Sequence, residues 1–199
     1  MGDGREMRKS VTYGNFTFVE SDIQDVGFVD CKVYGDDRGA FMETYKRSDF
    51  VKGGITADFV QDNQSMSRRN VLRGLHFQIA HPQAKLVRVI EGSVYDVCVD
   101  LRTDSPTFGK WEGVELSGEN HRQLFIPRGF AHGFYVMSET AVFCYKCDDV
   151  YHPNDEGGIA WDDKDLAVAW PLEVGTEPIL SQKDQMHPTF AEWKKSNNI

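Results

Sequence analysis

The sequence has no long apolar run: none of its segments reaches the ~18 consecutive apolar residues that a membrane-spanning helix needs. We therefore expect no contact with a membrane. It also shows no secretory signal, because residues 1–10 (MGDGREMRKS) are polar throughout. We interpret residues 1–10 as a polar N-terminal extension or tag remnant and residues 11–199 as a single domain.

Positive charge is scarce. Lysine and arginine total 22 against 31 acidic residues, which gives a formal net charge of −9. A protein that binds long nucleic acid needs a basic face, so the charge argues against such a partner. The net charge still allows a small anionic ligand that a few arginines hold.

Cysteine is also sparse. The four cysteines are Cys31, Cys98, Cys144 and Cys147, and the last two form the only CxxC motif. Residues three apart in an extended strand point to opposite faces, so this motif favours neither a redox pair nor a zinc knuckle. We expect ordinary reduced thiols and a cytoplasmic protein.

What the sequence does contain is a series of short β-like segments. Hydrophobic residues make up 40% of the chain, and strand-like runs recur about every 8–12 residues between turn signals. This rhythm predicts an all-β sandwich or barrel, and a jelly roll fits many short strands best. Residues 85–102 (KLVRVIEGSVYDVCVDLR) predict the clearest hairpin, with its turn at Glu91-Gly92-Ser93.

Two short helices interrupt this pattern. The segment 48–54 (SDFVKGG) predicts a helix with Ser48 or Asp49 as N-cap and Gly53 as stop. A second short helix is expected after Pro188.

The segment 71–78 (VLRGLHFQ) places Arg73 and His76 in an otherwise apolar strand. Strict alternation puts these side chains on opposite faces. Gly74 lies between them, and a glycine inside a strand often marks a bulge that could turn both into one cavity. The alternative is a core histidine with a local hydrogen bond and a surface arginine.

The segment 126–134 (IPRGFAHGF) contains Pro127, Gly129 and His132 in a spacing that resembles the second motif of the cupin superfamily, a jelly-roll group. Metal-binding cupins also carry a His-x-His with a following glutamate on an earlier strand. Here that strand offers His76-Phe77-Gln78 instead. Zinc or iron needs three or four ligands, so the sequence predicts no metal site.

Four polar residues suit proton transfer instead. His76 could be a base, Tyr145 an acid, Lys85 a stabiliser of an anion and Asp184 a group that orients a histidine. An acid and a base on opposite sides of a substrate can take a proton from one face and return it to the other. Each residue also has a structural alternative. His76 could be a core histidine, Tyr145 an interior tyrosine, Lys85 a solvated strand end and Asp184 a helix cap.

An ordered series of segments, from DDRGAFMETY through VLRGLHFQ, RQLFIPRGFAHGF and YKCDDVYHPNDEGGIAWDD to ILSQKD, resembles the dTDP-4-dehydrorhamnose 3,5-epimerases of deoxysugar biosynthesis nearly end to end. The resemblance implies a double-stranded β-helix, or cupin-type jelly roll, with short flanking helices. It implies an isomerase without metal or cofactor. The implied reaction converts dTDP-4-dehydro-6-deoxy-D-glucose to dTDP-4-dehydro-L-rhamnose, inverting C3 and C5 through an enolate.

The resemblance also implies roles. His76 matches the base, Asp184 its partner, Tyr145 the acid and Lys85 the group beside the C4 oxygen. The positions that match substrate contacts are Gln61, Asp62, Asn63, Arg73, His132, Glu156 and Lys183. Arg38 and Glu43 match residues that the family contributes across a homodimer interface.

Three alternative functions stay open from the sequence. The first is an epimerase that inverts only C3 or only C5 of a related nucleotide-linked 4-keto sugar. The second is a non-catalytic jelly roll that binds sugar, and it would not need the proton-transfer residues. The third is a metal-dependent cupin enzyme, which a stoichiometric metal in the purified protein would favour.

Overall fold

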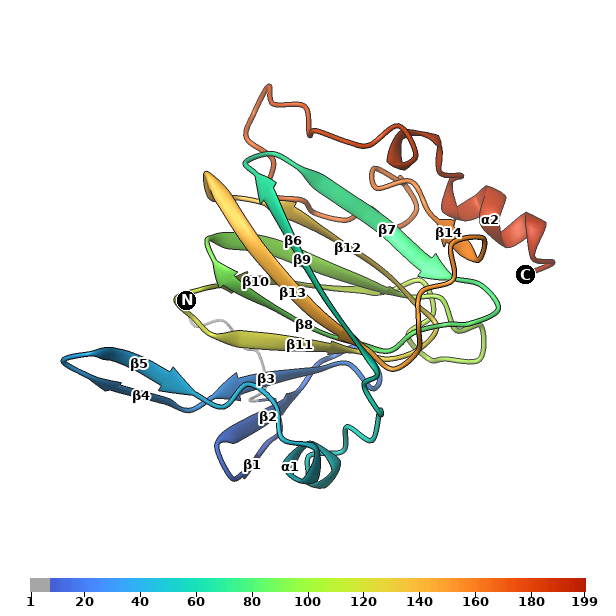
Figure 1. Cartoon of the computed structure of the whole chain (residues 1–199). Coiled ribbons are helices and arrows are strands. Elements are labelled where there is room, and N and C mark those ends of the chain that lie inside the picture. Colours follow the sequence, from blue (N-terminus) through green and yellow to red (C-terminus); the bar gives the residue numbers. More distant parts are fainter. Residues whose placement is uncertain (1–7) are drawn as a thin grey trace, which may run out of the picture.

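Antiparallel strands in two facing sheets form the body of the computed structural model, which describes residues 8–199 (Figure 1). The seven-stranded sheet has the order β1 (Ser10–Tyr13), β2 (Phe16–Glu20), β3 (Gly27–Cys31), β11 (Arg122–Ile126), β8 (Lys85–Glu91), β13 (Thr140–Cys147) and β6 (Gln61–Arg68). The five-stranded sheet has the order β10 (Trp111–Ser117), β9 (Ser93–Asp100), β12 (Phe130–Val136), β7 (Leu72–Gln78) and β14 (Glu156–Gly158). The remaining elements are the hairpin of β4 (Val33–Asp36) and β5 (Gly39–Met42), the helices α1 (Arg47–Lys52) and α2 (Phe190–Ser196), and the 3₁₀ helix η1 (Asp184–Met186). The predicted jelly roll with short flanking helices is confirmed.

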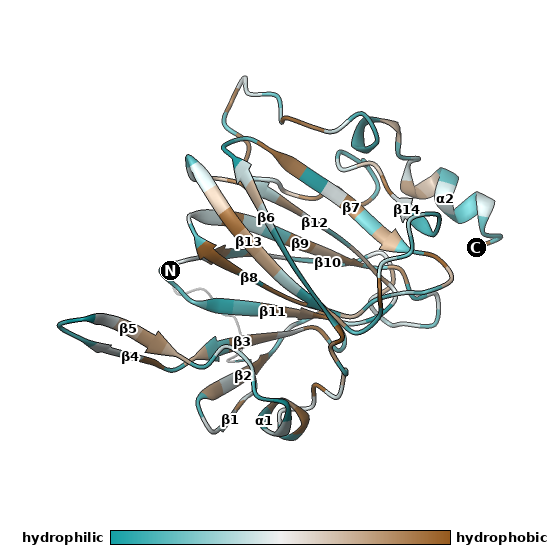
Figure 2. Ribbon diagram, viewed as in Figure 1, coloured by the Kyte–Doolittle hydropathy of each residue, from teal (hydrophilic) through white to brown (hydrophobic). Residues whose placement is uncertain are grey.

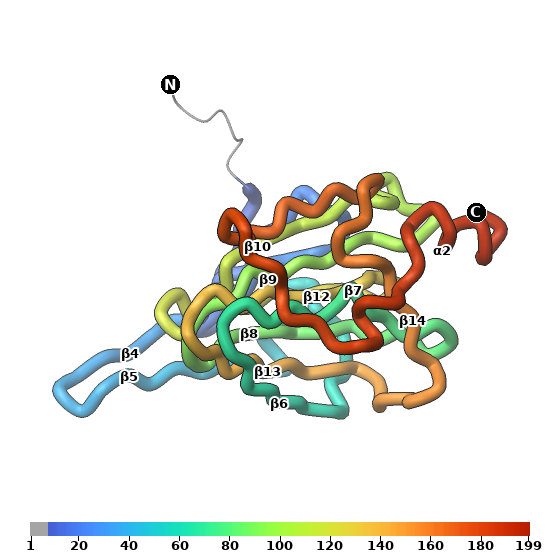
Figure 3. The backbone as a smooth tube through the Cα atoms, turned by 90° about the horizontal axis from the view of Figure 1, so that it is seen from above, coloured from blue at the N-terminus to red at the C-terminus, as the bar shows by residue number. Residues whose placement is uncertain are grey.

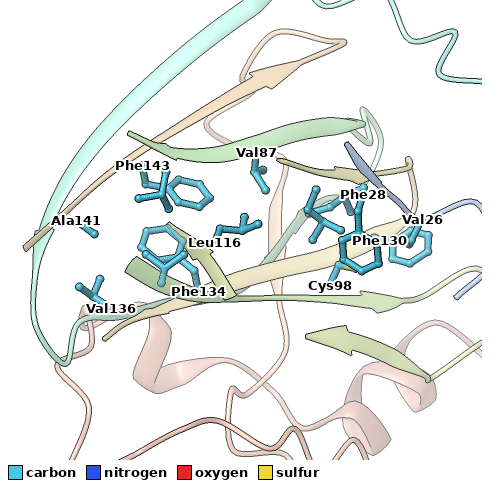
Figure 4. Close-up of a cluster of buried hydrophobic side chains, with 14 of the residues drawn as sticks. Val26, Phe28, Val87, Cys98, Leu116, Phe130, Phe134, Val136, Ala141 and Phe143 are labelled. Carbon is cyan, nitrogen blue, oxygen red and sulfur yellow. The ribbon is translucent and has the colours of Figure 1, made fainter. Parts of the chain in front are cut away.

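Alternating side chains build the core between the sheets. Phe143 on β13 stacks on Phe134 of β12, with ring centroids 4.3 Å apart. Figure 4 shows this pair at one end of the cluster and Phe28, Val26 and Phe130 at the other. Figure 2 shows hydrophobic residues in the central strands β8 and β13. Successive side chains of a strand point to opposite faces, so every second residue of these strands enters the core.

The predicted hairpin over residues 85–102 is wrong. Both strands exist, but β8 pairs with β11 and β13, whereas β9 pairs with β10 and β12 of the other sheet. Gly92 is the corner at which the chain changes sheets. It has φ +77°, and an added Cβ would lie 2.0 Å from the carbonyl oxygen of Thr140. Only glycine fits so close an approach at a positive φ, and the same glycine signal also marks a hairpin turn.

Helix positions were predicted better than helix caps. The helix α1 ends at Gly53 as expected, but its N-cap is Lys46, so Ser48 and Asp49 lie inside the first turn. The helix after Pro188 is confirmed as α2. Its N-cap Thr189 forms a capping box with Glu192, in which each side chain bonds the other residue's backbone N–H.

The segment after β14 packs on the outer face of the five-stranded sheet. Its Leu166 and Phe190 join Leu75, Val97 and Ala131 in a second apolar cluster. In Figure 3 the C-terminal trace, in red, crosses over β7 and β12. Backbone hydrogen bonds between residues 70–72 and 179 tie this segment to the start of β7. The segment thereby carries Asp184 back to the sheet.

The β4–β5 hairpin projects from the body of the protein (Figures 1 and 3). Its apolar side chains Val33, Tyr34 and Phe41 are exposed, Phe41 by 66%. Large exposed apolar side chains that lie together often mark an interaction site, so this arm is a candidate contact surface.

The predicted extension covers residues 1–10, and residues 1–7 of it lie outside the described residues. Arg8 already contacts the body through an ion pair with Glu112 (3.1 Å), and Ser10 begins β1. Within residues 8–199, no helix has both the length and the apolar character needed to cross a membrane.

The backbone at Gly74 yields a first prediction. Gly74 has φ +126°, and an added Cβ would lie 2.5 Å from the Cα of Gly133 on β12. Gly54 also has a positive φ, +91°, but an added Cβ there would meet nothing within 4 Å. We expect Gly54→Ala to cost about 1–3 kcal/mol of backbone strain, and Gly74→Ala roughly 1–3 kcal/mol more because it also overpacks two strands.

Urea unfolding of both variants measures this difference. Equal losses of unfolding free energy in the two variants would show that the close approach of β7 and β12 adds no cost to the substitution at Gly74.

Candidate active site

A cavity of about 390 Å³ lies between the sheets, beside the polar end of the apolar core. Strands of both sheets line it, and the C-terminal segment closes one side. Nine of the predicted site residues line this cavity: Asn63, Arg73, His76, Lys85, His132, Tyr145, Glu156, Lys183 and Asp184. They come from seven separate stretches of chain, so the fold alone brings them together.

The bulge expected at Gly74 is present. The pairing of β7 with β12 shifts between His132 and Phe134, so three residues of β7 span the distance of two on β12. This irregularity directs both Arg73 and His76 into the cavity. Of the two interpretations of this segment, the structure agrees with the one in which both side chains line one cavity, with Arg73 exposed and His76 partly buried.

His76 and Asp184 form a hydrogen-bonded pair. The Nε2 atom of His76 lies 2.5 Å from Oδ1 of Asp184, and Ser181 donates its hydroxyl to Oδ2 at 2.7 Å. Asp184 is 4% exposed. Burial alone would raise the pKa of this carboxyl, but the hydrogen bonds from His76 and Ser181 outweigh burial and lower the pKa to about 2.

This pair fixes the proton on the imidazole. An ionised carboxylate can only accept hydrogen bonds, so Nε2 of His76 carries the proton that Asp184 accepts. The lone pair of the neutral ring then lies on Nδ1. The side chain of His76 is 37% exposed, in contrast to the buried Asp184. The arrangement therefore suits a general base whose orientation the carboxylate holds.

Tyr145 is the candidate acid on the opposite sheet. It lies on β13, whereas His76 lies on β7 of the five-stranded sheet, and both line the cavity. Burial raises the pKa of Tyr145, so its phenol keeps its proton at neutral pH. A protonated phenol across the cavity from Nδ1 of His76 provides one donor and, when the imidazole is neutral, one acceptor of protons.

Lys85 adds a partly buried cation to the same cavity. It is the first residue of β8, and burial lowers the pKa of its ammonium group. A lowered pKa makes the ammonium a stronger hydrogen-bond donor to an oxygen that gains negative charge. Lys85 is thus suited to stabilise an enolate.

His132 forms a second histidine–carboxylate pair, with Asp96. Its Nε2 lies 3.1 and 3.0 Å from the two carboxylate oxygens of Asp96, and its ring stacks on Phe143. His132 is also directly opposite His76 in the pairing of β12 with β7. The sequence reasoning missed Asp96, although an acid inside the apolar run VYDVCV was a signal.

Ser181 and His187 were also missed. The spacing Ser-x-x-Asp in SQKD, residues 181–184, was a signal for Ser181, because a serine three residues before an aspartate commonly bonds it locally. His187 lies one 3₁₀ turn after Asp184, with its Nε2 3.6 Å from Oδ1. Nothing in the local sequence distinguishes it from a surface histidine.

Four predicted residues do not line this cavity. Asp62 points outward from β6 and forms an ion pair with Lys146 at 2.6 Å, while Gln61 lies at the strand end and donates to Asn63. Arg38 lies at the tip of the β4–β5 hairpin, and Glu43 follows that hairpin. Neither of these two reaches the cavity of its own chain.

Lys183 and Glu156 lie together at the cavity wall. The ammonium group of Lys183 pairs with the carboxylate of Glu156, which comes from β14. The pair brings a residue of the C-terminal segment against the five-stranded sheet. It also leaves Lys183, whose side chain is more than half exposed, near the entrance for an anionic ligand.

Comparisons with known proteins agree with this geometry. The family model described as dTDP-4-dehydrorhamnose 3,5-epimerase matches residues 20–192. The dTDP-4-dehydrorhamnose 3,5-epimerase of Methanothermobacter thermautotrophicus is 51% identical over 170 residues, which cover 85% of this chain and 92% of the relative.

Two crystal structures are similar throughout. The dTDP-4-dehydrorhamnose 3,5-epimerase of Elizabethkingia anophelis has a TM-score of 0.85 and 48% identity over 90% of this chain and 98% of its own. The dTDP-6-deoxy-D-glucose-3,5-epimerase of Legionella pneumophila, solved in complex with dTDP-4-keto-L-rhamnose, has a TM-score of 0.84 and 49% identity. That match covers 87% of this chain and 92% of the Legionella chain.

Proposed function

The chain belongs to the dTDP-4-dehydrorhamnose 3,5-epimerase family, and we propose that His76 and Tyr145 are the base and the acid of its reaction. It is an isomerase that inverts C3 and C5 of dTDP-4-dehydro-6-deoxy-D-glucose to give dTDP-4-dehydro-L-rhamnose. One observation carries the assignment of roles. The His76–Asp184 pair and Tyr145 line one cavity from opposite sheets.

The substrate itself makes the proton transfers possible. A ketone at C4 acidifies the hydrogens on both neighbouring carbons, C3 and C5. Removal of either proton gives an enolate whose negative charge lies mainly on the C4 oxygen. Lys85, with an ammonium group of lowered pKa in the cavity wall, would donate a hydrogen bond to that oxygen.

Nδ1 of His76 would take the proton from one face of the sugar. Its other nitrogen donates to Asp184, which holds the ring in the required tautomer and stabilises the imidazolium that forms. Tyr145 would then deliver its phenolic proton to the opposite face of the same carbon. His76 then releases the removed proton to solvent and the phenolate takes one from solvent, so both groups are restored, the carbon centre is inverted and no redox cofactor enters the balance.

Arg73 and Lys183 would hold the diphosphate. Arg73 donates Nε and Nη2 to Ser67, which fixes the guanidinium plane and leaves further N–H donors for a phosphate oxygen. His132, oriented by Asp96, would contact the sugar. The remaining contacts that we propose for the nucleotide sugar are Gln61, Asp62, Asn63 and Glu156.

We also propose that the protein works as a homodimer in the cytoplasm. The exposed apolar arm β4–β5 would pack on a second copy and bring Arg38 and Glu43 to the partner's substrate site, which explains why neither reaches its own cavity. The four free cysteines support a reducing compartment.

His76→Asn tests the base. The variant cannot accept a proton at Nδ1, so turnover should fall by at least about 10²-fold. In D₂O, the wild type should place deuterium at both C3 and C5 of the substrate, as read by NMR, and the variant at neither. The control is His121→Asn, because His121 lies outside the cavity and has φ +53°, which asparagine tolerates.

More than about a tenth of wild-type turnover in His76→Asn would contradict the role of His76, since a positioned base contributes ~10²–10⁴-fold. Deuterium at one carbon only in the wild type would mean a single-centre epimerase.

Tyr145→Phe tests the acid. Without the phenolic proton, reprotonation from the far face should slow, while His76 can still remove a proton and return it to the same face. We expect net inversion to fall by about 10²-fold or more and proton exchange with D₂O to fall much less.

The control for Tyr145→Phe is Tyr95→Phe, which removes a half-buried hydroxyl on the outer face of the five-stranded sheet. Equal losses of inversion and exchange in Tyr145→Phe would contradict its role as the acid.

Phe41→Asp tests the homodimer. A charge in place of an exposed apolar side chain of the arm should convert the dimer to a monomer in sedimentation equilibrium. It should also raise KM, because Arg38 and Glu43 of the partner would no longer reach the substrate. Val174→Asp, at a fully exposed valine outside the arm, is the control. A wild-type protein that sediments as a monomer would contradict the proposal.

A further inference from the structure

Three potential metal ligands, one of them His76 itself, lie close together on the Nε2 side of the His76 ring. His76, Asp184 and His187 each offer one ligand atom, and these atoms lie within 4.8 Å of one another. Oδ1 of Asp184 lies between the two rings, 2.5 Å from Nε2 of His76 and 3.6 Å from Nε2 of His187. The rings meet edge to face, with centroids 5.4 Å apart.

His187 is a buried histidine without a hydrogen bond at Nε2. Among the described residues, this nitrogen has no hydrogen bond, although Oδ1 of Asp184 lies 3.6 Å away, and the side chain is only 9% exposed. The ring also fills the space above Gly158, where an added Cβ would lie 2.3 Å from its Cε1. An unpartnered buried nitrogen costs about 1–3 kcal/mol, so its position calls for a compensating partner.

The charges around His187 favour a bound cation. The carboxylate of Asp184 lies 3.6 Å from Nε2 of His187 and would supply one negative charge to a bound cation. The ammonium group of Lys183 is the nearest competing cation, and it is paired with Glu156.

We propose that a divalent transition-metal ion of the zinc type binds between His76, Asp184 and His187 and inhibits the enzyme. Two imidazoles and one carboxylate are a ligand set that zinc accepts, with water in the fourth position. Magnesium and calcium prefer oxygen ligands and should not compete.

Inhibition would follow from the tautomer of His76, and this step rests on the proposed role of His76 as the base. The metal takes the position of the proton between Nε2 and Asp184. The ring proton moves from Nε2 to Nδ1 by exchange with solvent, so the ring ligates the metal through Nε2, stays neutral and carries its one proton on Nδ1. Nδ1 then has no lone pair with which to remove a proton from the sugar.

The ion would bind on the side of His76 that faces away from the substrate. His187 lines a second cavity, of about 600 Å³, and does not line the first one. The two cavities adjoin and share six lining residues, Phe77, Gln78, Gln83, Lys85, Glu156 and Lys183. Metal and sugar could therefore be bound at the same time, and inhibition should lower kcat and leave KM unchanged.

The test uses the full-length chain after treatment with a chelator. Titration with Zn²⁺ by calorimetry, and with Co²⁺ followed by its visible absorption, measures binding without any assay of turnover. We expect one ion per chain. In His187→Asn and His187→Gln, the affinity should fall by at least about tenfold, as is usual when a metal site loses an interaction of this kind.

His121→Asn is the matched control for metal binding, because it removes a histidine outside the cluster. Inhibition is compared as the ratio of turnover with and without Zn²⁺, so any change in the basal rate of a variant cancels. Two histidine variants keep the test valid if one of them fails to fold.

Several results would overturn the proposal. They are no stoichiometric binding to the wild type, equal affinity in both His187 variants and in the wild type, or inhibition that is competitive with the sugar. Binding that depends on His187 but leaves turnover unchanged would establish the metal site and overturn inhibition. That result would also contradict the assignment of His76 as the base. Because metal binding is measured directly, this outcome is distinguishable from failure of the metal site.

Discussion

The contact between His76 and Asp184 is the interaction on which the rest of the site depends. It joins residues 108 positions apart, one on a strand inside the jelly roll and one on the segment that wraps around its outside. Two features of the fold make the contact possible. The bulge at Gly74 turns His76 into the cavity, and the apolar cluster under α2 holds the C-terminal segment against the five-stranded sheet. A change to either feature would move the carboxylate relative to the imidazole, although neither touches the substrate.

The space between the sheets is divided into an apolar part and a polar part. At the apolar end, Phe134 and Phe143 stack and exclude water. At the polar end, each buried acid has a basic or hydroxyl partner, as Asp96 does in His132. This pairing lets ionised groups remain inside a sandwich without a large loss of stability. It also gives an acidic protein a local cluster of cations, so the net charge of −9 does not prevent binding of a diphosphate.

Local patterns predicted the strands, the bulge and the helix after Pro188, because each depends on near neighbours in the sequence. They could not predict which strands pair. The glycine at position 92 marks both a hairpin turn and a corner between sheets, and only the packing of distant strands decides between these two. The same limit applies to the site. His76 and Asp184 were candidates from their local sequence, and the family resemblance implied their roles. Asp96 was missed because its partner His132 is 36 positions away, and His187 because nothing in its local sequence marks it.

The orientation of one imidazole decides which chemistry this cavity can support. With the proton on Nε2, shared with an ionised Asp184, His76 presents a lone pair to the substrate and the site can move protons. The same carboxylate and the neighbouring His187 would hold a cation together with Nε2 of His76 once that proton has moved to Nδ1. A histidine–carboxylate pair is thus a base on one side and a potential metal ligand on the other. The cupin-type jelly roll can accommodate both chemistries because its strands place several inward-facing polar side chains around one cavity. The identity and partner of each such side chain, rather than the fold, determine whether a proton or a metal ion occupies the position.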